Sequence, residues 1–321
     1  YKMLTTLPDS KRYLLVPEGQ PVPRGLDEDV SILQEPLQNI YLVASGVMDM
    51  FASLDAVDQI RFSGQKQENW YIQTAKDAMA AGDMIYAGKY SKPDYELLVS
   101  EGCDLAIENR MITHSPEVVE MLQSFDIPVM IEYSSYEQHP LGKVEWVKFF
   151  GALTGKEAEA EEAFAEQTEI LEKVESGEKT GKTIAFFYVT SNGLIQVRQS
   201  TDYIPKLIEL AGGRYIFEDL EDSGSGRSTL NMQVEDFYAG AKDADILIYN
   251  SSIDGGVTTL DELIGKCNIL KDFKAVQEGQ VYCTTNDMYQ QSMAIGDLLQ
   301  DMHTVLTDDD TAKLRYLFLL Q

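Results

Sequence analysis

The sequence predicts an α/β protein made of two similar doubly wound lobes that are joined by a single long helix. Short apolar runs alternate with amphipathic stretches from about Gln38 onward, a pattern typical of βαβ units around a parallel sheet. Residues 140–176 interrupt this alternation with apolar residues at helical spacing, and the alternation resumes at Lys179. The 321 residues also exceed the length of roughly 250 to 300 at which one hydrophobic core stops growing. We therefore expect a first lobe over 1–142, a bridging helix over 143–177 and a second lobe over 178–321.

The first lobe should contain four strands with helices between them. Its strand candidates are short apolar runs at 40–44, 60–63, 105–108 and 128–131. Its helix candidates lie at 47–54, 70–80, 94–100 and 116–125. The last of these opens with Ser115 as N-cap and Pro116 at the first helical position, both favoured there. A leader over 1–37 precedes these elements, and its segment "YLLVPEGQPVP" is expected to add an edge strand.

The bridging segment is predicted to be a two-part helix. Its apolar residues fall at helical spacing in two groups: Trp146, Phe149, Phe150 and Leu153, then Ala160, Phe164, Leu171 and Val174. The stretch "LTGKEAEAEEAF" restarts the helix after Gly155, with Thr154 as the candidate cap. A loose linker would be rich in Gly and Ser and would not keep an apolar stripe.

The second lobe repeats the pattern of the first. Strands are expected at 183–188, 246–249 and 281–283, and helices at 203–211, 234–241, 259–264 and 293–306; the turn-rich "DSGSGRS" covers 222–228. The segments "PDYELLVSEGCDLAIEN" and "MQVEDFYAGAKDADILIYN" share one layout, in which Glu96 precedes Asp104 by eight positions and Glu235 precedes Asp243 by eight. This echo indicates an internal repeat, although βα punctuation alone can also produce it.

The charge balance excludes several classes of partner. The 26 basic and 53 acidic residues give a net charge of −27, which repels nucleic acids and anionic membrane surfaces. No run of about 18 apolar residues occurs, so no membrane-spanning helix is expected. The sequence begins at Tyr1 without an initiator Met, and we expect an export signal to lie outside it.

Neither the cysteines nor the histidines indicate a metal site. Cys103, Cys267 and Cys283 are odd in number and widely spaced, so they predict small buried side chains and no disulfide framework. The three histidines, at 114, 139 and 303, are equally dispersed. The sequence also lacks the phosphate-loop, dinucleotide-binding, H-E-x-x-H and G-x-S-x-G motifs, so we expect no catalytic residues and no enzyme.

The candidate ligand-binding residues lie in loops that follow predicted strands, where open α/β sheets place their ligands. They combine aromatic rings, cations and a thioether: Met48, Tyr90, Lys92, Arg110 and Tyr136 in the first lobe, and Arg198, Arg227 and Tyr289 in the second. Aromatic faces supply contact area, and cations neutralise carboxylates or catecholates. This combination predicts a planar or anionic chelate as the ligand.

Taken together, the chain resembles the substrate-binding proteins of ABC importers that take up ferric siderophores, haem or cobalamin. Four segments carry the resemblance: "VASGVMDMFASLDAVDQI"; "AGKYSKPDYELLVSEGCDLAI" with "LQSFDIPV"; "HPLGKVEWVKFFGALTGKEAEAE"; and "YIPKLIELAGGRYIF" with "VEDFYAGAKDADILIYN". They extend over nearly everything from Asn39 to Leu306. Two features depart from the family pattern: Met48-Asp49 stands where Thr-Glu is usual, and the leader precedes the usual first strand.

The resemblance implies a role for several residues. A glutamate on each lobe docks to arginines of the permease, and Glu96 and Glu235 fall at those places; a first-turn acid is also favoured by the helix dipole alone. The aromatic position that stacks on the ligand falls on Tyr90. The resemblance further implies a monomer without a cofactor of its own, outside the cytoplasm as a lipoprotein or free periplasmic protein, with an ABC permease and its ATPase as partners.

The identity of the ligand stays open at this point. A ferric siderophore suits the arginines and tyrosines best, while Met48, Met288 and the tyrosines leave haem, and the family leaves cobalamin, as alternatives. A relative that binds a bare metal ion is disfavoured by the scattered histidines. A chelatase or reductase on the same two-lobed scaffold would need cysteine ligands or a histidine base.

Overall fold

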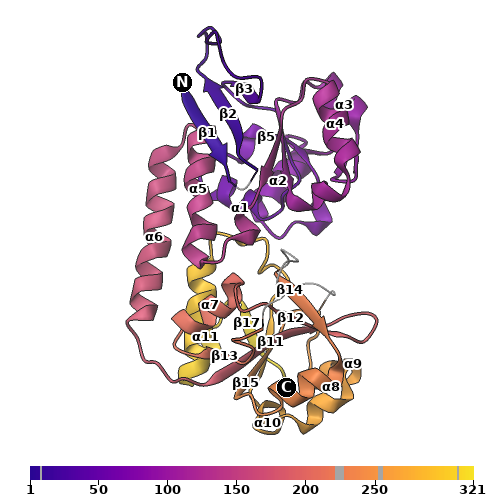
Figure 1. The fold of residues 1–321 in the computed structure, drawn as a ribbon, viewed down its shortest axis with the longest axis vertical. Coiled ribbons are helices and arrows are strands. Elements are labelled where there is room, and N and C mark those ends of the chain that lie inside the picture. The colour runs from indigo at the N-terminus through magenta and orange to yellow at the C-terminus, as the bar shows by residue number, and fades with distance from the viewer. Residues whose placement is uncertain (8, 221–227, 252–255, 309–310) are drawn as a thin grey trace. The chain divides into compact units, whose positions relative to one another are not determined.

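The protein is described by a computed structural model over residues 1–7, 9–220, 228–251, 256–308 and 311–321 (Figure 1). Its contacts define two compact units. Tyr1–Ser135 and Glu145–Phe164 form the first, and Tyr136–Val144 and Ala165–Gln321 form the second. We call these units the first and the second lobe. Within the described ranges, no helix is both long and apolar enough to cross a bilayer.

The first lobe is built around a five-stranded parallel sheet in the order β10-β9-β4-β5-β6. Its strands are β4 (Ile40–Leu42), β5 (Ile60–Ser63), β6 (Ile85–Tyr86), β9 (Leu105–Asn109) and β10 (Val129–Glu132). Its helices are α1 (Val47–Ser53), α2 (Gln73–Ala81), α3 (Tyr95–Ser100) and α4 (Pro116–Ser124), with the 3₁₀ turns η1 (Val57–Gln59), η2 (Gln67–Asn69), η3 (Arg110–His114) and η4 (Ser134–Tyr136). Nearly every residue of β4, β5 and β9 is buried, as expected of strands with helices on both faces. The four predicted strands and four predicted helices of this lobe are confirmed, whereas the edge strand β6 was not predicted.

The leader forms a small sheet of its own and not the predicted edge strand. β1 (Lys2–Thr6) pairs antiparallel with β2 (Lys11–Val16), which pairs in parallel with β3 (Val30–Gln34). The three strands form a sheet separate from the five-stranded one. The buried phenol of Tyr13 donates to the carbonyl of Val129 at 3.1 Å and so attaches the leader to β10. The prediction of an edge strand is wrong. Successive side chains of β2 point to opposite faces of the sheet, and four in a row, Tyr13, Leu14, Leu15 and Val16, are buried, so both faces of β2 are covered.

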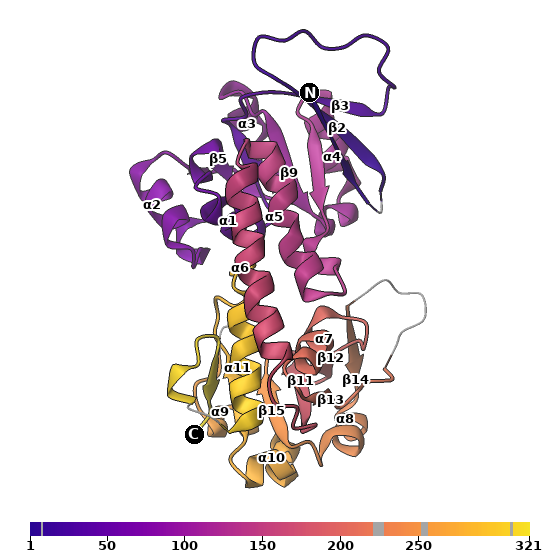
Figure 2. The same cartoon turned by 90° about the vertical axis from the view of Figure 1, so that its left-hand side faces the viewer.

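The helical segment consists of α5 (Pro140–Thr154) and α6 (Glu157–Glu175) (Figures 1 and 2). The chain turns between them at Gly155, whose φ of 73° is unstrained only without a side chain. Within the first lobe the two helices lie side by side: a Cβ on Gly151 would lie 2.5 Å from the Cβ of Ala160, and Lys148 Nζ lies 3.2 Å from Glu161 Oε2. Thr154 does not cap α6; its hydroxyl donates to the carbonyl of Phe150 at 2.8 Å.

The second lobe contains a mixed sheet in the order β14-β12-β11-β15-β16-β17, with β13 also paired to β11. Its strands are β11 (Thr183–Val189), β12 (Ile195–Arg198), β13 (Arg214–Tyr215), β14 (Thr229–Met232), β15 (Ile246–Tyr249), β16 (Val281–Thr284) and β17 (Leu317–Leu319). Its helices are α7 (Tyr203–Leu210), α8 (Val234–Ala241), α9 (Leu260–Lys266), α10 (Lys274–Gln277) and α11 (Ile295–Thr307), with η6 (Asn268–Asp272) and η7 (Thr311–Lys313). α8, α9 and α10 enclose one core with the sheet, and α7 contacts α11 on the other side (Figure 2).

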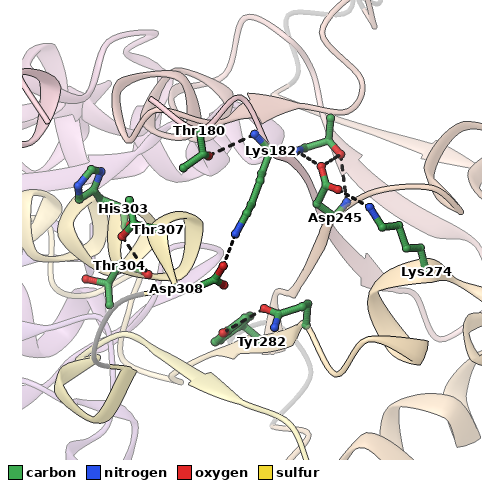
Figure 3. Close-up of polar contacts among 11 residues, drawn as sticks. Thr180, Lys182, Asp245, Lys274, Tyr282, His303, Thr304, Thr307 and Asp308 are labelled. Atoms are coloured by element: carbon green, nitrogen blue, oxygen red, sulfur yellow. Dashed lines mark hydrogen bonds and ion pairs between the residues drawn. The ribbon is translucent and has the colours of Figure 1, made fainter. Parts of the chain in front are cut away.

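The two lobes share a structural aspartate at the same place in their sheets. Asp104 precedes β9 and accepts the backbone N–H groups of Gln38 and Asn39 ahead of β4, at 2.9 and 2.8 Å. Asp245 precedes β15 and accepts the N–H and hydroxyl of Thr183, at 2.7 and 2.8 Å, where β11 begins (Figure 3). The partner of Asp104 in the repeat is therefore Asp245.

The predicted repeat placed Asp243 opposite Asp104, and this is wrong by two residues. Asp243 is exposed and forms an ion pair with its neighbour Lys242. The difference arises because α8 is two residues longer than α3, while both helices end five positions before the next strand. Glu96 and Glu235 remain equivalent, since each is the second residue of its helix.

Candidate ligand-binding site

A two-stranded hairpin carries the aromatic loop of the first lobe. β7 (Gly88–Lys89) pairs with β8 (Lys92–Pro93), and Tyr90 is in the turn between them. Gly88 has φ of 89°, and a Cβ there would come within 2.2 Å of the carbonyl oxygen of Lys92, so the hairpin requires glycine. Tyr90 is half-buried and packs against the core of the lobe, while Lys92 is exposed. The hairpin thus presents a supported phenol ring beside a solvated cation.

On β9 the structure places a buried acid that was not among the residues predicted from the sequence. Glu108 is fully buried on β9, and neither of its carboxylate oxygens has a hydrogen-bond partner among the described residues. Burial raises its pKa to about 8. The sequence signal was a lone acid within the apolar run "LAIEN".

The other predicted residues of the first lobe have different environments. Met48 is the second residue of α1 and is fully buried, so the loop position and ligand contact predicted for it are wrong. The physical reason is that α1 begins at Val47, so that Met48 is already helical and lies in the core. Arg110 opens η3, and its charge lowers the pKa of the Tyr133 phenol, which burial nevertheless raises to about 12.

Tyr136 was expected in the first lobe but belongs by its contacts to the second. It is the last residue of η4 and is 42% exposed. The boundary between the lobes along this part of the chain falls between Ser135 and Tyr136.

Two predicted residues of the second lobe meet directly. Arg198 ends β12, is 9% exposed, and donates from Nη2 to the phenol oxygen of Tyr289. Its Nη1 lies 3.3 Å from Asp202 Oδ2, which forms a buried ion pair. Burial lowers the pKa of Arg198, but Tyr289 and Asp202 raise it by a larger amount. The pKa therefore ends above its ordinary value, and the guanidinium stays charged.

The phenol of Tyr289 is the centre of this cluster. Its oxygen also accepts a hydrogen bond from Asn250 Nδ2 at 2.7 Å. Among the described residues, none accepts a hydrogen bond from its O–H. Burial raises the pKa of Tyr289, while Arg198 and Asn250 act to lower it. Tyr289 can therefore donate a hydrogen bond outward while Arg198 and Asn250 hold its oxygen in place.

A small pocket of about 10 Å³, room for about one water-sized group, lies beside Tyr289 in the second lobe. It is lined by Lys143, Tyr203, Met288, Tyr289, Gln291, Ala294, Ile295, Leu298 and Tyr316. Lys143 is buried, and its ammonium group lies 5.0 Å from the centre of the Tyr203 ring. The pocket thus combines a cation, a phenol donor, an amide and a thioether on an apolar wall.

Most of this pocket was not predicted from the sequence. Lys143 comes from α5, Tyr203 from α7, and Gln291 from the loop before α11, so only folding brings them together. Asp202 could have been found, because it follows Arg198 by four positions and caps α7 by accepting the N–H of Ile204 at 3.0 Å.

The remaining predicted residues lie elsewhere. Glu96 and Glu235 are exposed in the first turns of α3 and α8. Arg227 lies outside the described residues. In the part of the chain that the structure describes, no group of three or more His, Cys, Asp or Glu side chains could hold a metal ion.

Comparison with known proteins places the chain in a family. The model of the family described as "Periplasmic binding protein" matches residues 42–288. An uncharacterized lipoprotein of Methanocaldococcus jannaschii is 25% identical over 316 residues, which cover 92% of this chain and 72% of that protein.

Solved structures share the fold. A possible iron-binding, periplasmic solute-binding protein of Staphylococcus epidermidis matches with a TM-score of 0.64 and 17% identity, over 84% of this chain and 98% of that one. The periplasmic haem-binding protein HutB of Vibrio cholerae matches with a TM-score of 0.67 and 14% identity, over 84% and 99%. These matches confirm the predicted α/β fold class, and the match of the family model over most of the chain identifies it: the chain belongs to the periplasmic binding protein family.

Proposed function

We propose that this protein is the extracytoplasmic solute-binding component of an ABC importer, and that it captures a ferric siderophore or a similar metal chelate and delivers it to a membrane permease. The chain belongs to the periplasmic binding protein family, and its structural neighbours include a possible iron-binding and a haem-binding protein, which supports a binding protein over the chelatase and reductase alternatives. The observation that carries the proposal is the pocket at Tyr289. It offers Lys143 and a phenol O–H to an acidic ligand.

The chemistry of this pocket fits a carboxylate, catecholate or hydroxamate oxygen. A buried ammonium group neutralises negative charge, and hydrogen bonds to a charged oxygen are about twice as strong as neutral ones. Arg198 contributes to ligand binding indirectly. Its charge is balanced by Asp202, and its guanidinium group donates a hydrogen bond to the phenol of Tyr289. We therefore propose Tyr289 and Lys143 as ligand contacts and Arg198 as the residue that positions Tyr289.

In the first lobe we propose Tyr90 and Lys92 as ligand contacts. The hairpin holds the ring of Tyr90 against the core, so that only its outer part is available for stacking. Arg110 and Tyr136 remain candidates, since both lie in the segments that follow β9 and β10. Haem is the second candidate ligand, because Met288 lines the same pocket as Tyr289 and a thioether can ligate haem iron. Cobalamin is the third.

For delivery we propose that Glu96 and Glu235 dock to the permease, which works with its ATPase. Both carboxylates are exposed at equivalent helix starts. The lipoprotein relative supports an anchored form over a free periplasmic one.

The test is a binding titration with a ferric hydroxamate, a ferric catecholate, haemin and cyanocobalamin, each followed by calorimetry. One of the first two should bind, and Tyr289→Phe should weaken that binding about tenfold, as expected for the loss of one charge-assisted hydrogen bond. Tyr238→Phe, on α8 against the core, is the matched control and should bind like the wild type. Binding of haemin alone would replace the siderophore by haem, and the absence of binding to all four would refute the proposal.

A further inference from the structure

Glu108 is buried without a hydrogen-bond partner among the residues that the structure describes. Its side chain is fully buried near the end of β9, and both carboxylate oxygens lack a hydrogen bond within the described part of the chain. An uncompensated polar group in an apolar environment is costly, and an ionised one far more so. A residue with this cost calls for a physical explanation.

The surroundings of Glu108 are apolar or phenolic. Ile131 lies opposite it on β10, and Tyr41 lies on the adjacent strand β4, opposite Ala106, so that Tyr41 and Glu108 are diagonal neighbours on one face. Burial alone shifts the pKa of Glu108, while its carboxyl raises the pKa of Tyr41 and of Tyr95 from α3; Tyr86 from β6 and Cys103 ahead of β9 also raise that of Tyr41. No ion pair joins Glu108 to a cation in the described ranges. Apart from burial, the carboxyl of Glu108 is the largest influence on the pKa of Tyr41, which it raises.

Tyr41 in turn holds the hairpin in place. Its phenol donates to the carbonyl oxygen of Gly88 at 2.8 Å, where β7 begins. The base of the hairpin is further fixed by Ala87, whose N–H donates to Ser63 at 3.0 Å and whose carbonyl accepts the N–H of Asp94 at 2.8 Å. The Tyr41 phenol is the side-chain link between this hairpin and the sheet beside Glu108.

We propose that Glu108 is a proton-controlled positioning residue for the hairpin that carries Tyr90. While Glu108 is neutral, the phenol of Tyr41 keeps its hydrogen bond to the carbonyl of Gly88, and this bond fixes the hairpin to the sheet. When Glu108 loses its proton to solvent, the carboxylate attracts the O–H of Tyr41 away from Gly88, and the hairpin is released.

The direction of this exchange follows from the strengths of the two hydrogen bonds. A phenol O–H bound to a carboxylate forms a shorter and stronger bond than one bound to a neutral carbonyl. Neither oxygen of the buried carboxylate has a donor among the described residues, whereas the Gly88 carbonyl, released with the hairpin, can bond to water. Burial raises the pKa of Glu108 to about 8, so the exchange falls at mildly alkaline pH.

We call the exchange of the Tyr41 hydrogen bond between Gly88 and Glu108 the latch. An effect of the latch on ligand affinity rests on the proposed function of Tyr90, but the latch itself does not. The test is therefore made on the ligand-free protein, by hydrogen exchange at the amides of Ala87 and Asp94. Rates are corrected for the intrinsic pH dependence and compared at about pH 6 and about pH 9.5, on either side of the Glu108 transition. Protection in the wild type should fall at least tenfold at the higher pH. Glu108→Gln should keep its protection at both values, and Tyr41→Phe should show the lower protection at both.

Glu132→Gln is the matched control, since Glu132 is also a buried glutamate at the end of the neighbouring strand but accepts hydrogen bonds from Ser134. It should behave like the wild type. A carboxyl titration of the wild type by ¹³C NMR checks the same idea without substitution, and its midpoint should coincide with the loss of protection. Equal pH dependence in the wild type and Glu108→Gln, or a Glu108 midpoint below about pH 6, would overturn the latch. Ligand binding by a protein with no latch would leave the proposed function intact.

Discussion

Arg198 and Tyr289 are hydrogen-bonded to each other in the second lobe, with the guanidinium as donor and the phenol oxygen as acceptor. Both residues were expected to contact ligand, but Arg198 is only 9% exposed and its guanidinium is paired with Asp202. Arg198 therefore positions Tyr289 without being exposed to ligand itself. We expect its replacement to lower the free energy of unfolding before it affects binding.

We predict that Arg198→Ala lowers the free energy of unfolding by about 3 to 5 kcal/mol, because it leaves the carboxylate of Asp202 buried and unpaired. Denaturant unfolding measures this. Arg214→Ala is the control, because Arg214 pairs with Glu218 at the surface and should contribute at most about 1 kcal/mol. Equal effects of the two substitutions would contradict a supporting role for Arg198.

Tyr90 can be tested by removing its hydroxyl and its ring separately. If the ring stacks on the ligand, Tyr90→Phe should retain affinity, and Tyr90→Ala should lose about 1 to 3 kcal/mol of binding free energy. If the phenol oxygen ligates iron, Tyr90→Phe should abolish the visible charge-transfer band of the complex. Titration with the ferric ligand that binds the wild type distinguishes these results, and wild-type affinity in the Ala variant would exclude Tyr90 from the site.

Glu96→Ala combined with Glu235→Ala should abolish uptake by vesicles that contain the cognate permease, while ligand affinity and thermal midpoint stay near wild type. Each exposed first-turn carboxylate contributes only about 0.3 to 1 kcal/mol to folding through the helix dipole, but an interface bond to arginine is stronger. The control is Glu117→Ala with Asp261→Ala, two exposed first-turn acids on α4 and α9. Loss of uptake in both pairs would indicate a general charge effect and not docking.

Glu108→Gln should make the stability of the protein less sensitive to a rise in pH from about 4.5 to about 8. The folded state holds the Glu108 proton up to a pKa of about 8, against 4.5 for an unburied glutamate. Its contribution to stability is therefore complete below about pH 4.5 and is lost as the pH rises to about 8, with an upper bound of about 5 kcal/mol. Denaturant unfolding at several pH values should show a smaller decline in the Gln variant, and parallel curves would argue against a buried neutral acid.

Asp245→Asn should destabilise the second lobe by about 1 to 3 kcal/mol, because hydrogen bonds from Thr183 and Lys274 to a carboxylate are weakened (Figure 3). Burial raises the pKa of Asp245, but these bonds lower it overall, so its contribution is present above about pH 4 and is lost as the pH falls through its folded-state pKa. Asp243→Asn is the control two residues away, at an exposed position, and should have little effect. Thermal unfolding at neutral and acid pH measures both.

The sequence was sufficient for those elements whose pattern is local. The bounds of β5, β15 and α8 match the predicted ones, because an apolar run or a helical period is written in consecutive residues. β12 and β14 were missed, since "IQVR" and "TLNM" become strands through pairing with each other. The family resemblance and the roles open to Tyr90 and Glu96 likewise followed from contiguous segments.

Tertiary structure alone decided which of the candidate side chains can work together. Burial of Met48 in α1 depends on how that helix packs, and the pairing of Arg198 with Tyr289 joins residues 91 positions apart. The same holds for Lys143 over Tyr203 and for the unpartnered carboxyl of Glu108 beside Tyr41. A sequence shows that a residue can be charged or aromatic, but burial, partners and pKa depend on the groups that folding brings around it, and those come from distant parts of the chain.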